Sequence, residues 1–207
     1  MPINQSEADF FHKLEQQAIA SPAKPLNKQT IQDFRATGVL LQQYATSTAK
    51  TPFIEKTIST RDDHTIPIRV YNPQLGQTKP VFIMYPGCGY ILDLFDINAA
   101  VASQIANYAK AKVIIVNYRL APEASMPIPI DDAYDAVKYI SMYAETFDID
   151  PNKIIIGGLS SGAHAAAVIT NLARTDRRLN ILHQILFNGI YDLTNSQHGY
   201  DGKPPLK

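Results

Sequence analysis

The sequence predicts an α/β fold: a mostly parallel sheet with an N-terminal antiparallel hairpin and helices on both faces. Short apolar strands alternate with amphipathic helices along most of the chain, which is the pattern of parallel β-α units. The segment KIIIGGLSSGAHAAA, residues 153–167, reads as a strand, a tight turn and a helix. Its turn has glycines two positions on either side of a serine, at Gly158, Ser160 and Gly162.

The composition limits the classes of protein to which this chain can belong. A length of 207 residues suits one domain, and 19 basic residues balance 19 acidic ones. Zero net charge argues against nucleic acid or an anionic membrane surface as a partner. No apolar run approaches the ~18 residues of a membrane span. The single cysteine, Cys88, excludes an internal disulfide, and the N-terminus lacks a basic stretch followed by an apolar one. A cytoplasmic location is therefore expected.

Residues 1–50 are expected to form a helical lid or cap segment. The first helix, residues 8–20, gathers its apolar residues on one face, namely Phe10, Phe11, Leu14, Ala18 and Ile19. Its polar face lacks the basic bias of a membrane-surface helix, so packing against its own domain is favoured. A second helix begins near Asn27 or Thr30, with an apolar stripe made of Ile31, Phe34, Leu41 and Tyr44.

Residues 51–193 are expected to form the α/β core, followed by a polar tail at 194–207. Phe53–Thr60 and Ile66–Tyr71 have strand composition and are joined by a polar turn, which predicts a hairpin. Four further strands are expected, at Val81–Tyr85, Val113–Tyr118, Ile154–Ile156 and Ile181–Phe187.

Helices are expected between these strands. Asn98 is predicted to cap a helix over residues 98–111 that turns three residues inward, Val101, Ile105 and Tyr108. A second helix is predicted over residues 130–143. Asp131 and Asp132 in its first turn suit the positive end of the helix dipole.

The G-x-S-x-G turn carries the first candidate for chemistry. A serine on a strained turn between a strand and a helix projects its hydroxyl out of the fold, and small residues at Gly158 and Gly162 leave room for the bend. Ser161 then begins the helix, so its N–H points freely toward a negative charge beside Ser160. The alternative is a glycine-rich turn in some other parallel sheet.

A second glycine-rich loop follows Val81–Tyr85. The residues after this strand, Pro86 to Tyr90, include Gly87, Cys88 and Gly89 and leave their backbone N–H groups accessible. Such a loop beside a serine elbow supplies hydrogen-bond donors to a developing oxyanion. An ordinary loop or a phosphate cradle is the alternative, but neither common nucleotide-binding glycine motif follows a strand. No cluster has metal-ligand spacing, and no cofactor is predicted.

With these residues the chain resembles the hormone-sensitive-lipase-like branch of the α/β-hydrolase fold, the microbial carboxylesterases and acetyl esterases. The resemblance rests on TIPIRVYNP, VFIMYPGCGYIL, VIIVNYRLAPE, MPIPIDDAYDAV and DPNKIIIGGLSSGAHAA. It implies a small-molecule acyl ester as substrate and Ser160 as nucleophile. It also implies an oxyanion hole made by the N–H groups of Cys88, Gly89 and Ser161, and N-terminal lid helices.

Two motifs depart from that family. Its H-G-G-G loop is here Pro86-Gly87-Cys88-Gly89, and its G-D-S-A-G-G is GLSSGA, residues 158–163. These changes predict an altered site, because Pro86 has no N–H to donate and Cys88 adds a side chain to the loop. We expect that side chain to lie beside Ser160.

The triad order of this fold is serine, acid, histidine. In the family, the acid and the histidine follow two strands beyond the last one predicted here, so the chain is expected to be C-terminally truncated, with an exposed sheet edge through which it forms a homo-oligomer. The candidate substitutes are few: His164, His183, Asp176 and the pair Asp192 and His198. The alternative function is accordingly a catalytically dead or truncated α/β-hydrolase-like binding or scaffold protein.

Overall fold

The structure is a computed structural model in which the chain divides into two compact units, residues 1–34 and 35–207. The residues that it describes are 31–33, 35, 36, 38, 51–75 and 80–191. Those of 31–38 that are described are helical, as predicted for the second N-terminal helix. The predicted helix at 8–20 and the tail at 194–207 lie outside the described residues.

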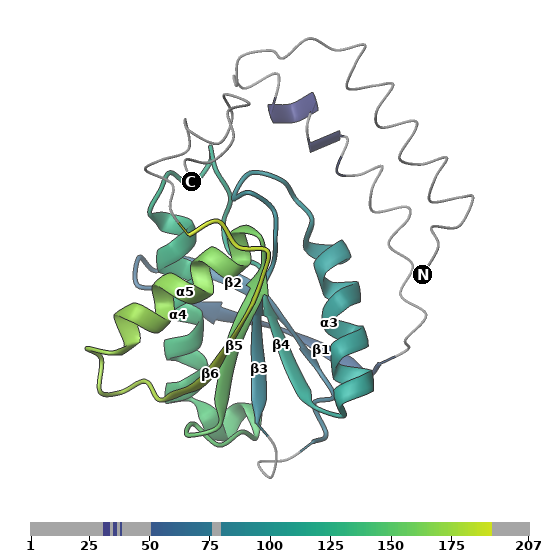
Figure 1. The fold of residues 1–207 in the computed structure, drawn as a ribbon, viewed down its shortest axis with the longest axis vertical. Coiled ribbons are helices and arrows are strands. Elements are labelled where there is room, and N and C mark those ends of the chain that lie inside the picture. Colours follow the sequence, from purple (N-terminus) through teal and green to yellow (C-terminus); the bar gives the residue numbers. More distant parts are fainter. Residues whose placement is uncertain (1–30, 34, 37, 39–50, 76–79, 192–207) are drawn as a thin grey trace, which may run out of the picture. The chain divides into compact units, whose positions relative to one another are not determined.

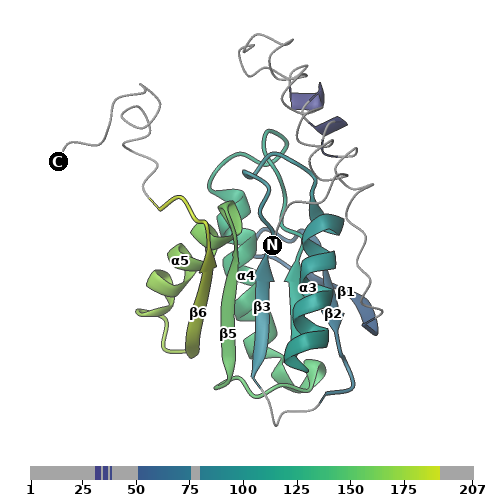
Figure 2. The ribbon, with the colours of Figure 1, turned by 45° about the vertical axis from the view of Figure 1, so that its right-hand side comes forward.

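A six-stranded sheet in the order β1-β2-β4-β3-β5-β6 forms the centre of the second unit (Figure 1). Its strands are β1 Phe53–Ser59, β2 Thr65–Tyr71, β3 Val81–Tyr85, β4 Lys112–Val116, β5 Ile154–Leu159 and β6 Ile181–Phe187. β1 and β2 form the predicted antiparallel hairpin, and β2 also runs antiparallel to β4. The other pairings are parallel, and Figure 2 shows β3, β5 and β6 running the same way. The predicted mixed, mostly parallel sheet is confirmed.

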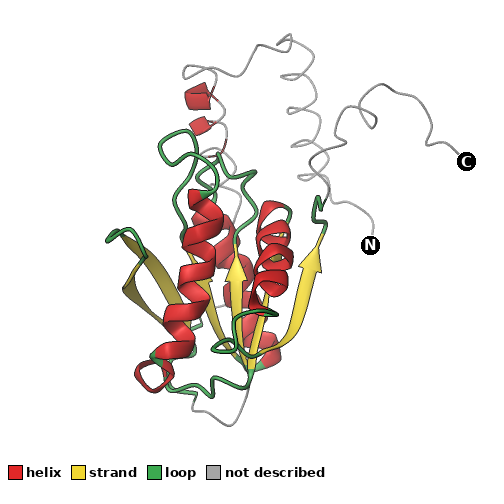
Figure 3. Cartoon of the chain, turned by 90° about the vertical axis from the view of Figure 1, so that its left-hand side faces the viewer, coloured by secondary structure: helices red, strands yellow, loops and turns green. Residues whose placement is uncertain are grey.

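Helices cover both faces of this sheet (Figures 1 and 3). They are α3 Phe95–Ala109 on one face and α4 Ile128–Met142 and α5 Ser161–Ala173 on the other, with a short 3₁₀ helix at Ala144–Phe147. Alternate residues of each strand serve the two cores: Phe82 and Met84 pack with α3, whereas Ile83 and Tyr85 pack with α4 and α5. In the described part of the chain, no helix is long and apolar enough to cross a membrane.

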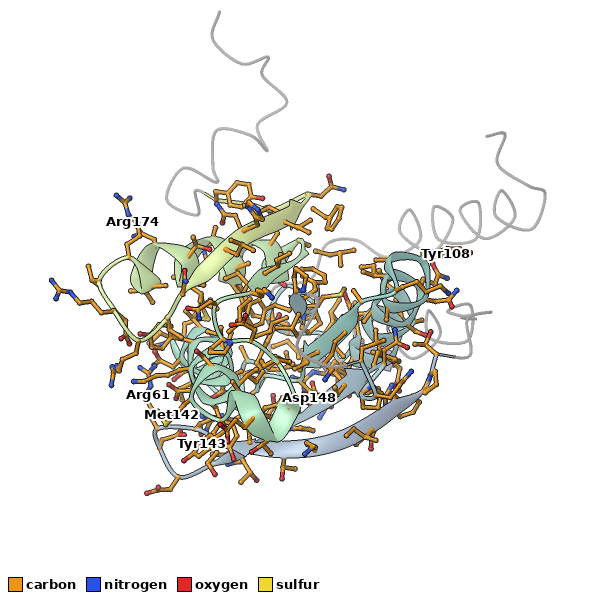
Figure 4. The ribbon with its side chains drawn as sticks, turned by 90° about the horizontal axis from the view of Figure 1, so that it is seen from below. Arg61, Tyr108, Met142, Tyr143, Asp148 and Arg174 are labelled. Carbon is orange, nitrogen blue, oxygen red and sulfur yellow. The ribbon has the colours of Figure 1, made fainter. Side chains whose placement is uncertain are left out.

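The inward face of α3 matches the prediction at Val101 and Ile105, which pack against the core, but differs from it at Tyr108. Its buried residues include Ala99, Ala102 and Ala106, so small side chains bring this helix close to the sheet. Tyr108 was expected to face inward but is 81% exposed, and Figure 4 shows it at the periphery of the molecule. The apolar stripe of a helix covers a limited arc, and the alanines occupy the arc that faces the sheet.

Candidate active site

Ser160 lies at the carboxyl end of the parallel strands, on the turn from β5 to α5. β5 continues three residues beyond its predicted end, to Leu159, so Ser160 follows the strand directly. Its φ and ψ are 51° and −118°, a strained conformation for a residue with a side chain, and the residue is exposed. The Ser160 N–H donates to the carbonyl of Phe187 at the end of β6, at 2.8 Å. The turn therefore has the shape that the G-x-S-x-G pattern predicts.

The two glycines of this motif are required by close backbone contact. A Cβ added to Gly158 would lie 2.6 Å from the carbonyl carbon of Gly162. One added to Gly162 would lie 2.6 Å from the carbonyl carbon of Tyr85 and 2.8 Å from the carbonyl oxygen of Pro86. The end of β3 thus packs directly against the start of α5, which brings the loop after β3 next to the serine turn.

Asn98 holds this loop by a paired hydrogen bond. Gly87 N–H donates to Asn98 Oδ1 at 2.9 Å, and Asn98 Nδ2 donates back to the Gly87 carbonyl at 3.1 Å and to the Leu94 carbonyl at 2.8 Å. Asn98 was predicted to cap α3, but the helix begins at Phe95 and Asn98 lies in its first turn. An asparagine near a helix start reads as a cap in the sequence, and its role in holding the loop is seen only once the loop after β3 lies against it.

We expect Asn98→Ala to lower the free energy of unfolding by about 1–3 kcal/mol, because the loop would lose its partner inside the protein. Thermal or urea unfolding measures this loss. Asn107→Ala is the matched control on the same helix, since among the described residues its amide has one exposed contact, accepted from Lys110 Nζ at 3.5 Å. Equal stability of the two variants would contradict this role for Asn98.

The structure brings together the predicted oxyanion residues. The N–H groups of Cys88 and Gly89 both point at the Ser161 hydroxyl, and each donates to Ser161 Oγ at 2.9 Å. Gly89 has a φ of +59°, which turns its N–H toward the same point as that of Cys88. Ser161 is the first residue of α5, so its own N–H has no partner within the helix. Three backbone donors therefore lie on or immediately around Ser161.

The side chain of Cys88 lies elsewhere than predicted. Cys88 is 4% exposed, and its Sγ lies 3.1 Å from the hydroxyl of Tyr118 in the core rather than in an open site beside Ser160. Burial raises the pKa of this thiol. Tyr118 Oη also donates to the Pro86 carbonyl at 2.6 Å. The thiol of Cys88 and the carbonyl of Pro86 thus tie the loop to the buried hydroxyl of Tyr118.

Tyr90 is a residue of the site that the sequence did not single out. Its hydroxyl donates to the Ser161 carbonyl at 2.8 Å and lies 2.7 Å from Nδ1 of His164. Since a carbonyl only accepts, the Tyr90 proton goes to Ser161, and His164 Nδ1–H donates to Tyr90 Oη. Burial lowers the pKa of His164, which favours this neutral form. In the sequence, the position of His164 four residues after Ser160 on α5 was the feature that could have indicated a polar partner near the serine.

The other candidate acids and bases are placed away from the serine. Asp176 accepts from Arg178 and from Tyr134 after the end of α5, and these bonds hold its pKa well below its ordinary value. His183 is an exposed residue in the first half of β6, away from the end at which that strand supports Ser160. Asp192 and His198 lie outside the described residues. Among described side chains, no group of three or more His, Cys, Asp or Glu could hold a metal ion.

A family model described as the alpha/beta hydrolase fold matches residues 81–205. Carboxylesterase NlhH of Mycobacterium tuberculosis is 37% identical over 123 residues, which are 59% of this chain and 39% of that protein. Ethyl acetate hydrolase of Pseudomonas putida is 34% identical over 127 residues, with the same two shares. The chain thus spans well under half the length of these relatives.

The fold matches solved esterases. A hyperthermophilic esterase from the archaeon Pyrobaculum calidifontis superposes with a TM-score of 0.80 at 29% identity, over 94% of this chain and 61% of that one. The fold is therefore shared with an esterase of known structure, and the resemblance noted in the sequence is confirmed. The chain belongs to the alpha/beta hydrolase fold family.

Proposed function

We propose that this chain is the serine-bearing part of a carboxylic-ester hydrolase, with Ser160 as its nucleophile. The observation that carries this proposal is the exposed Ser160 at positive φ, next to a loop that directs two backbone N–H groups at the following residue. The names of the relatives, a carboxylesterase and an ethyl acetate hydrolase, support a small-molecule acyl ester as substrate.

In this mechanism Ser160 Oγ attacks the acyl carbon, and the proton that it loses is delivered to the alcohol oxygen that departs. The carbonyl oxygen becomes an oxyanion, and the N–H groups of Cys88, Gly89 and Ser161 stabilise it. The bond to the alcohol oxygen then breaks, the alcohol leaves with a proton, and the acyl group stays on Ser160. Attack by water releases the carboxylic acid and restores the serine. Each lost donor of this kind costs ~3–4 kcal/mol of transition-state stabilisation.

A fluorophosphonate probe tests the proposal. In the complete protein it should label one peptide at Ser160, and labelling should disappear in Ser160→Ala, because only a nucleophilic serine attacks the phosphorus. Ser59→Ala, which removes an exposed serine of β1, should label like the parent. Peptide mass spectrometry locates the adduct. A folded protein that hydrolyses p-nitrophenyl acetate without any dependence on Ser160 would refute the assignment.

A second candidate is a catalytically inactive α/β-hydrolase-like binding or scaffold protein. The observation that favours it is the surroundings of Ser160: within the described residues no side chain hydrogen-bonds its Oγ. Loss of the histidine from a serine hydrolase costs ~10⁶ in kcat. The same probe separates the two functions, because a binding protein would stay unlabelled while retaining affinity for an ester.

We also propose that residues 1–50 act as a lid, that the chain works in the cytoplasm, and that it self-associates through β6. The single thiol, buried and needing no oxidising compartment, supports the cytoplasmic location.

The proposed self-association rests on β6. This strand is the last of the described strands on its side of the sheet and carries exposed apolar residues, namely Leu182, Ile185 and Phe187. Such an edge is a template for pairing with another strand.

A further inference from the structure

The side chain of Ser161 occupies the donors that the proposed mechanism needs. Its Oγ accepts hydrogen bonds of 2.9 Å from both Cys88 N–H and Gly89 N–H. Each backbone N–H carries one hydrogen, so a donor bonded to this hydroxyl cannot give a full hydrogen bond to a second acceptor. In the structure, two of the three proposed oxyanion donors are therefore already satisfied from within the protein.

A directed chain of hydrogen bonds holds the hydroxyl there. Tyr118 gives its only hydroxyl proton to the Pro86 carbonyl, so Tyr118 Oη accepts from the thiol of Cys88. The sulfur in turn accepts the Ser161 hydroxyl proton at 3.9 Å. With its proton directed to Cys88, Ser161 Oγ presents its lone pairs to the two N–H groups. Ser161 itself is buried, at 8% exposed.

We propose that Ser161 is an internal competitor for the oxyanion site, and that its hydroxyl must rotate away before an acyl oxygen binds Cys88 N–H and Gly89 N–H. This inference rests on the proposed function. It assigns to Ser161 two opposite effects: its backbone N–H favours the oxyanion, whereas its side chain opposes it. The Ser161 side chain would then lower the reactivity of Ser160 toward esters, because it keeps the two N–H groups bonded to its own hydroxyl.

Ser161→Ala tests the competition, because it removes the hydroxyl and leaves the backbone N–H in place. We expect the second-order rate constant with p-nitrophenyl acetate to rise about tenfold. The acyl oxygen then no longer has to displace the Ser161 hydroxyl from the N–H groups of Cys88 and Gly89. We also expect faster amide hydrogen exchange at Gly89 in the unliganded protein, measured by NMR. Gly89 is exposed, so the Ser161 hydroxyl is the group that protects its N–H. Thr170→Val, which removes a hydroxyl bonded to the Ala166 carbonyl on the same helix, should change neither quantity.

A Ser161→Ala variant that is folded but reacts no faster than the parent would overturn the proposal, and a slower one would assign the hydroxyl a supporting role. If neither protein reacts through Ser160, the proposed function fails, and amide exchange then decides the inference alone. In that case unchanged exchange at Gly89 would overturn it, and faster exchange in the variant would support it.

Discussion

Replacing Asp132 by alanine is expected to lower the free energy of unfolding by about 3–5 kcal/mol. The carboxylate of Asp132 is fully buried and accepts from the backbone N–H, Nε and Nη2 of Arg119, at 3.0, 2.9 and 2.6 Å. Alanine would leave a guanidinium that is 21% exposed without its main partner, and a backbone N–H without an acceptor. Urea unfolding followed by circular dichroism measures the loss.

Asp131→Ala is the matched control, because it removes the neighbouring carboxylate on the same helix. That group is 36% exposed and pairs with Arg61, which is 48% exposed, so its removal should cost less than about 1 kcal/mol. The hydrogen bonds that Arg119 donates to Asp132, and next to Asp62, raise the pKa of its guanidinium. Arg119 therefore stays charged at neutral and alkaline pH, and the difference between the two variants should persist there. Equal losses would contradict a special role for the buried pair.

The sheet and the serine turn could be predicted because local pattern determines them. A parallel strand buried on both faces is a short uninterrupted apolar run, and Val81–Tyr85 has in the structure the bounds that its composition predicts. The turn at Ser160 could be predicted because the G-x-S-x-G spacing marks it within five residues, although the contacts that require these glycines come largely from Tyr85 and Pro86. Both features follow from short stretches of chain.

The partners of polar residues could not be predicted in the same way. Asp131 and Asp132 look equivalent in the sequence, yet only Asp132 is buried, because the loop after β4 folds back and presents Arg119 to it. Asn98 looks like a cap until the loop after β3 is placed against it. The Ser161 hydroxyl meets its donors across 72 and 73 positions of sequence. Such contacts depend on how distant elements pack, which periodicity does not describe.

Gly162→Ala is expected to lower the free energy of unfolding by about 3 kcal/mol, with loss of probe labelling at Ser160. In an open helix this change would stabilise by up to about 1 kcal/mol, because alanine is the better helix former. Here the new methyl group would lie within 2.8 Å of backbone atoms of Tyr85 and Pro86, so β3 or α5 must shift. A shift of 1 Å at the serine turn is enough to reduce reactivity by about 10²-fold. Thermal unfolding and fluorophosphonate labelling measure the two effects.

Gly89→Ala separates lack of space from backbone strain. Gly89 has a φ of +59°, but nothing lies within 4 Å of an added Cβ, so this variant should lose only the roughly 1–2 kcal/mol that an alanine loses in the left-handed region. A larger loss at Gly162 than at Gly89 would mean that close packing of β3 against α5, rather than backbone freedom, fixes the position of Ser160. Retained stability in Gly162→Ala would contradict this, since the added methyl group would then have found room without moving the turn.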